Sequence, residues 1–69
     1  MHKGKIKEYS SNRGYGSVID SNSGEQFTVF ANYTDLKEGQ VLKEGQDVEY
    51  EIEYQRGGNW AVHVRFVGE

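Results

Sequence analysis

Two glycines flank an aromatic residue in the run Arg13-Gly14-Tyr15-Gly16-Ser17-Val18. If this run is a strand, neighbours without side chains leave the ring of Tyr15 on an uncrowded sheet surface. Such a ring is a platform on which a nucleobase can stack, and Arg13 beside it can meet a phosphate. The alternative is that Gly-Tyr-Gly forms a tight turn or a bulge.

A second aromatic run, Val-Phe-Ala-Asn-Tyr at residues 29–33, follows a polar loop. With Val29 and Ala31 facing the interior, alternation along a strand points Phe30 and Asn32 outward. An outward Phe30 beside the glycine-flanked ring is an unusual apolar patch for a monomer without a partner. Tyr33 lies at the end of this strand, where core packing is the alternative to ligand contact.

The charges are unevenly distributed over the 69 residues, whose net charge is −3. Residues 1–19 hold four basic residues and one acidic residue, whereas residues 20–69 hold four basic and ten acidic residues. A positive face on an acidic body is therefore expected. Lys5 and Lys7 can each neutralise a phosphate. The alternative is that these lysines only keep the edge of an N-terminal strand solvated.

Composition excludes several classes of protein. The length predicts one small domain over residues 1–69, with a modest core. The chain has no cysteine, which excludes disulfides and thiolate sites and fits a reducing compartment. It shows neither a signal peptide nor an apolar run near the roughly 20 residues of a membrane span. We therefore expect a soluble, cytoplasmic protein without membrane contact, and the sequence leaves the oligomeric state open.

Catalytic and metal chemistry have no support in the sequence. His2 and His63 are the only histidines, and almost the whole chain separates them. A metal site needs several convergent ligands, so none is expected. No set of nucleophile, base and orienting residue is present, and a domain of this size has no deep pocket. We expect no enzyme, no cofactor and no small-molecule substrate.

Strand patterns dominate the chain, and no window shows a helical period. The expected strands cover residues 3–9, 15–20, 26–33, 47–54 and 60–67. The fourth strand alternates Val48, Tyr50, Ile52 and Tyr54 on a buried face with Asp47, Glu49, Glu51 and Glu53 on a wet face. The fifth strand is expected to place Trp60, Val62, Val64 and Phe66 on one face. Five short strands with glycine-rich turns predict a small antiparallel barrel, because closure removes exposed edges.

A short repeat precedes the fourth strand. Leu-Lys-Glu-Gly-Gln at residues 36–40 recurs at residues 42–46. We interpret the two copies as glycine-centred turns, each following a leucine that anchors the loop to the core. Coincidence within a loop is the alternative.

The order of these pieces resembles that of a bacterial cold-shock domain, a five-stranded OB-type barrel. Gly4-Lys5-Ile6-Lys7 is similar to the family's opening Gly-Lys-Val-Lys. Residues 13–18 resemble its first ribonucleoprotein motif, usually Lys-Gly-Phe-Gly-Phe-Ile, and residues 29–33 resemble its second, usually Val-Phe-Val-His-Phe. Residues 42–52 also follow the family closely, so the resemblance covers nearly the whole chain.

The resemblance implies binding of single-stranded RNA or DNA on the sheet formed by the first three strands. Carried over by position, it gives Lys7 for the backbone and Tyr15, Phe30 and Tyr33 for stacking. Asn32 replaces the usual histidine and can hydrogen-bond a base edge. Together with Arg13 and Lys5, the predicted nucleic-acid-binding residues are Lys5, Lys7, Arg13, Tyr15, Phe30, Asn32 and Tyr33.

Three ring positions of the family are changed here. Glu8 stands where an exposed tryptophan is usual, and Ser17 stands where the second phenylalanine of the first motif belongs. The loop after Leu36 is shorter, with Gln40 or Val41 in the region of its usual aromatic residue. At about 1–3 kcal/mol for each stacked base, these changes predict weakened binding, and Glu8 adds repulsion toward phosphate.

The sequence therefore predicts a cold-shock-like barrel that binds single strands weakly and with little base preference. Such binding would melt or prevent RNA secondary structure. The alternative is a protein-interaction module on the same barrel that has lost nucleic-acid binding, and a structural remnant without a ligand is a third reading. We expect Trp60 to cap the open end of the barrel near Gly57-Gly58, with a displaced stacking site as the alternative.

Overall fold

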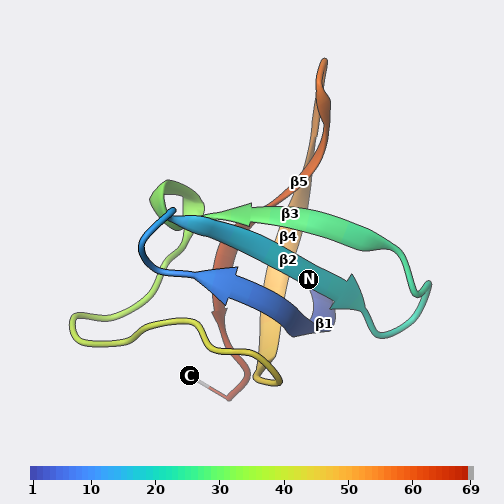
Figure 1. The fold of residues 1–69 in the computed structure, drawn as a ribbon. Coiled ribbons are helices and arrows are strands. Elements are labelled where there is room, and N and C mark those ends of the chain that lie inside the picture. Colours follow the sequence, from blue (N-terminus) through green and yellow to red (C-terminus); the bar gives the residue numbers. More distant parts are fainter. Residues whose placement is uncertain (69) are drawn as a thin grey trace.

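The computed structural model describes residues 1–68, which form five strands and one short 3₁₀ helix. The elements are β1 (His2–Ser10), β2 (Tyr15–Asp20), β3 (Gln26–Phe30), η1 (Ala31–Tyr33), β4 (Asp47–Gln55) and β5 (Gly58–Phe66). Strands β1, β2 and β3 lie side by side, and the β4–β5 hairpin crosses them (Figure 1). The sheet closes in the order β1-β2-β3-β5-β4, which confirms the predicted all-β, five-stranded barrel.

The barrel is closed by a parallel pair. Strands β3 and β5 run parallel, with Thr28 opposite Trp60, whereas the other four strand pairs are antiparallel. Apolar side chains from the strands and from one loop leucine fill the interior. This core consists of Ile6, Val18, Phe27, Val29, Leu42, Val48, Tyr50, Ala61 and Val64. Closure lets so short a chain surround one continuous core without an unpaired edge strand.

The third strand is shorter than the sequence predicted. Strand β3 ends at Phe30, and residues 31–33 form η1 instead of continuing to residue 33. The backbone N–H of Thr34 donates to Ala31 O at 3.3 Å, and the Thr34 hydroxyl donates to the same oxygen at 2.9 Å. This local turn ends the alternation, so Ala31 is exposed and does not face the core.

The fourth strand follows its predicted alternation only in part. Val48 and Tyr50 are fully buried and Ile52 is half-buried, but Tyr54 is 77% exposed. The reason is that the β4–β5 hairpin extends beyond the barrel, as its tip shows in Figure 1. Past Ile52 there is no core left to cover the inward face, so the predicted burial of Tyr54 is wrong.

A bulge interrupts the pairing of β5 with β4. Glu49 lies opposite Arg65, yet Glu51 lies opposite Val62, so β5 contains one additional residue between these pairs. His63 lies in this interval and has a φ of 52°. Residues other than glycine adopt this left-handed conformation rarely, and it is typical of a strand irregularity.

The bulge changes which β5 residues face outward. N-terminal to it, Ala61 is fully buried, and Trp60 lies opposite exposed Glu53 on the outer face. C-terminal to it, Val64 faces the core and Phe66 packs against it. The prediction that Trp60 shares a face with Val64 and Phe66 is therefore wrong, because simple alternation does not cross a bulge.

The sequence repeat forms two turns of the same design. In the first, the Lys37 N–H donates to Gln40 Oε1 at 2.8 Å and the Gln40 N–H donates to Lys37 O at 3.0 Å. In the second, Lys43 and Gln46 repeat the two bonds at 2.7 and 3.3 Å. The leucine before each turn packs against the core, which confirms the interpretation as anchored turns.

Candidate nucleic-acid interface

Four aromatic rings form a continuous outer surface, which we call the aromatic patch: Tyr15, Phe30, Tyr33 and Trp60. The Phe30 ring is central, with centroid distances of 6.1 Å to Tyr15, 6.1 Å to Tyr33 and 4.9 Å to Trp60. Tyr33 and Trp60 are nearly parallel at 21°, with centroids 5.9 Å apart. Tyr15 is 42% exposed and Tyr33 is 43% exposed, so Tyr33 is not packed in the core and its contact with a ligand stays a prediction.

The glycines beside Tyr15 are required by the backbone conformation and by the close approach of β1 and β2, and not by the Tyr15 ring. Gly14 has a φ of 77° in the turn that precedes β2. A Cβ on Gly16 would lie 2.6 Å from Tyr9 Cα, so only glycine fits where β2 approaches β1. Tyr15 lies between the two and opposite Phe30, which brings the two rings together at the start of β2.

Asn32 lies at the edge of the aromatic patch. It is exposed on η1, and with Phe30, Tyr33 and Trp60 it lines a shallow depression of about 120 Å³. The structure thus brings the three predicted rings and Asn32 together. The aromatic patch also includes Trp60, which was not among the predicted nucleic-acid-binding residues.

The two predicted lysines lie toward the other end of the sheet. The Lys5 ammonium is 3.7 Å from Asp47 Oδ1, and the Lys7 ammonium donates to Gln26 Oε1 at 3.4 Å. Gln26 pairs with the fourth residue after Tyr15 in β2, which places it about 13 Å along the strand from Tyr15. The lysines can therefore meet a backbone that runs along β2, but they do not flank the rings.

Arg13 and Glu8 share a hollow next to Tyr15. The hollow has a volume of about 340 Å³, and Tyr9 and Ser10 also line it. Within residues 1–68 the Arg13 guanidinium makes no hydrogen bond or ion pair. It is therefore available to a phosphate, while the Glu8 carboxylate opposes a phosphate at the same place.

Ser17 has an unusual environment on the same face. It is only 5% exposed, and its hydroxyl has no hydrogen-bond partner among the described residues. In the sheet register it lies between Glu8 of β1 and Thr28 of β3, and Thr28 lies opposite Trp60 of β5. One cross-strand row therefore runs from Glu8 to Trp60.

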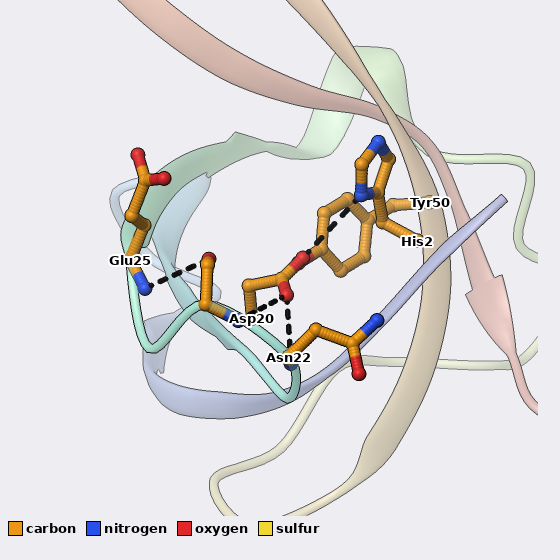
Figure 2. Close-up of polar contacts among 6 residues, drawn as sticks. His2, Asp20, Asn22, Glu25 and Tyr50 are labelled. Carbon is orange, nitrogen blue, oxygen red and sulfur yellow. Dashed lines mark hydrogen bonds and ion pairs between the residues drawn. The ribbon is translucent and has the colours of Figure 1, made fainter.

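A buried polar cluster at the opposite end of β2 fixes three strands (Figure 2). The Tyr50 hydroxyl donates to Asp20 Oδ2 at 2.7 Å, and the N–H groups of Asn22 and Ser23 donate to Asp20 Oδ1 at 2.9 and 3.1 Å. His2 Nδ1 lies 3.5 Å from Asp20 Oδ2. The bond from Tyr50, followed by that from Ser23, lowers the pKa of Asp20 despite its burial. Burial and the bond to Asp20 raise the pKa of Tyr50.

Residues 1–68 contain no group of three or more His, Cys, Asp or Glu side chains that could hold a metal ion. In the same part of the chain, no helix has the length and apolar character needed to cross a membrane.

A closed five-stranded barrel with rings on the outside of β2 and β3 defines the class of OB-type barrels, which use this face for oligonucleotides. The family model described as 'Cold-shock' DNA-binding domain matches residues 2–67. The chain belongs to this cold-shock domain family. Family membership supports nucleic-acid binding as its general function, and the family consists of binding domains and not of enzymes.

Individual relatives agree with this assignment. A cold shock-like protein of Thermotoga maritima is 37% identical over 65 residues, which cover 94% of this chain and 97% of the relative. The cold shock-like protein CspD of Escherichia coli K12 is 32% identical, covering 88% of this chain and 82% of the relative. Protein lin-28 of Caenorhabditis briggsae is 34% identical over 80% of this chain, which spans 23% of that protein.

Proposed function

We propose that this protein binds single-stranded RNA or DNA by stacking bases on Tyr15 and Phe30. The observation that carries the proposal is the contact of these two rings on the outer face of β2 and β3. Tyr33 extends the surface, and the exposed amide of Asn32 offers one donor group and one acceptor to a base edge. Stacking of this kind depends little on base identity, because every base has a π-face.

Phosphate attraction supplements stacking but is limited. Arg13 lies beside Tyr15, while Lys5 and Lys7 lie further along the sheet near Asp47 and Gln26. With these three cations, binding should weaken as salt rises from about 50 to 200 mM, but less steeply than for proteins that make six to ten phosphate contacts.

The affinity is proposed to be low for two physical reasons. The outer row from Glu8 through Ser17 to Thr28 carries no ring, so bases over β1 find no stacking surface. The carboxylate of Glu8 also repels a phosphate near Arg13. Weak, base-tolerant binding suits a protein that holds RNA unpaired and releases it, as an RNA chaperone does.

The test is a titration of labelled oligo-dT and oligo-rU at low salt, followed by fluorescence anisotropy. The parent is compared with Tyr15→Ala and Phe30→Ala, and with Tyr54→Ala as the matched control, because Tyr54 is an exposed ring outside the patch. Each patch variant should weaken binding about 5- to 150-fold, the loss of one stacked base, and the control should not. Absence of parent binding at low salt contradicts the proposal.

A protein partner is the second candidate for the same surface. The aromatic patch joins four rings, and acidic side chains at Glu8 and Glu53 lie beside its two ends. A contiguous apolar patch with an acidic border fits a basic protein partner as well as a base. This candidate gains support if the parent binds no oligonucleotide while the patch variants keep their fold.

A further inference from the structure

Trp60 contacts the rings of the proposed site while lying outside the core. Its ring meets the Phe30 ring edge-on, at 4.9 Å and 64°. It lies nearly parallel to the Tyr33 ring at 21°, with centroids 5.9 Å apart. Its neighbour Ala61 supplies the buried contact of this part of β5. The indole is therefore held in place by surface rings and leaves part of its own surface in solvent.

The register places this indole at one end of a cross-strand row. The row runs from Glu8 through Ser17 and Thr28 to Trp60. Neighbouring strands lie about 4.8 Å apart, so Trp60 lies about 10 Å from Ser17 across the sheet. The β1 end of the row is acidic and the β5 end is aromatic. Beyond Tyr15 and Phe30, a strand of nucleic acid thus meets a further exposed ring, Trp60, at the β5 end of this row.

We propose that Trp60 and Tyr33 form a base-stacking subsite, so that a bound single strand runs from Tyr15 over Phe30 and onto β5. This inference rests on the proposed function and adds the direction and extent of the contact surface. The depression lined by Phe30, Asn32, Tyr33 and Trp60 measures about 120 Å³. It is smaller than the roughly 300–1,000 Å³ of a pocket for drug-sized ligands, and it suits one planar base.

The subsite also contains a polar group for a base edge. Asn32 lines the same depression, and an amide side chain carries both donor and acceptor groups that can bond the edge of a base. Glu53 lies opposite Trp60 on β4, so a phosphate must pass on the side away from this carboxylate. Together these groups fix where the base and where the backbone lie.

The test uses the intrinsic fluorescence of Trp60, which is the only tryptophan of the chain. The unlabelled parent protein is titrated with oligo-dT at low salt, while anisotropy of a labelled copy of the oligonucleotide measures binding independently. A base stacked on the indole should quench its emission along the same binding curve. Trp60→Ala should weaken binding about 5- to 150-fold, and Trp60→Phe should retain most of the affinity.

Tyr54→Ala is the matched control. Tyr54 is a 77% exposed ring on the same hairpin, and it occupies the face that alternates with that of Trp60. The Tyr54→Ala variant should bind the oligonucleotide with the affinity of the parent. Melting curves show whether each variant folds. If the oligonucleotide binds the parent but Trp60 emission does not change, the subsite is wrong and the proposed function stands. If the parent binds no oligonucleotide, both fail.

Discussion

Removing the Tyr50 hydroxyl should destabilise the barrel in a pH-dependent way. Tyr50 is fully buried, and its hydroxyl donates at 2.7 Å to Asp20, which is 4% exposed. A hydrogen bond to a charged group contributes about 1.5–3 kcal/mol. Domains of this size shift their melting temperature by about 4–8 °C for each kcal/mol. Tyr50→Phe should therefore lower it by about 6–24 °C at neutral pH.

The sign of the pH dependence follows from the lowered pKa of Asp20. Its folded-state pKa lies below the ordinary 3.8, chiefly because Tyr50 donates to it. The stability that ionised Asp20 contributes is therefore fully present above its unfolded-state pKa, and it is lost as the pH falls through its folded-state pKa. In Tyr50→Phe the pKa of Asp20 returns toward its ordinary value, so less of this stability remains to be lost.

The assay is urea denaturation of both proteins at neutral pH and at an acid pH below the folded-state pKa of Asp20, which itself lies below 3.8. The difference in unfolding free energy should shrink in acid to about 0.5–1.5 kcal/mol, the contribution of a hydrogen bond between neutral groups. Tyr54→Phe is the control, because its exposed hydroxyl should contribute less than about 0.5 kcal/mol. An equal difference at both pH values would mean that the Tyr50 hydroxyl does not stabilise the ionised form of Asp20.

Three further results are expected. Gly16→Ala should lower the free energy of unfolding by about 1–3 kcal/mol in denaturant titrations, because the added Cβ would lie 2.6 Å from Tyr9 Cα. A variant as stable as the parent would show that the β1 backbone can move away from this Cβ at no cost. Gln46→Ala should cost about 0.5–1.5 kcal/mol, because its side chain accepts the Lys43 N–H at 2.7 Å; no loss would mean that the turn closes without it. Glu8→Gln should tighten oligonucleotide binding up to about fivefold at low salt, with little gain at high salt; unchanged affinity would place the phosphates away from Glu8.

Much of the barrel could be predicted because its strands obey simple alternation. Val48 and Tyr50 are buried as expected, and the turn residues mark the ends of β2 and β4. The prediction failed where a local backbone event overrode alternation. At Ala31 a turn closed by Thr34 replaces the strand, and at His63 a left-handed residue forms a bulge. Neither position carries a glycine or proline from which the turn or the bulge could have been predicted.

The placement of two candidate site rings could be predicted, because the strands that carry them pair directly. Tyr15 and Phe30 lie opposite each other, and their sequence runs already indicated outward rings. We expected Trp60 to cap the barrel, but the structure places it on the outer face. This outward position depends on the bulge at His63 and on the parallel pairing of β3 with β5. The strand pattern gave no sign of that pairing. The distance of Lys7 from the rings likewise depends on the register and not on the spacing in the sequence.

In the proposed function, the outer rings of β2 and β3 hold single-stranded bases. Its most direct test is an NMR titration of the protein with oligo-dT, in which the ring protons of each aromatic residue are followed. We expect the ring protons of Tyr15, Phe30 and Tyr33 to shift upfield as bases stack on them, while those of exposed Tyr54 stay in place. Binding that leaves the three rings unshifted, or that shifts Tyr54 instead, would contradict it.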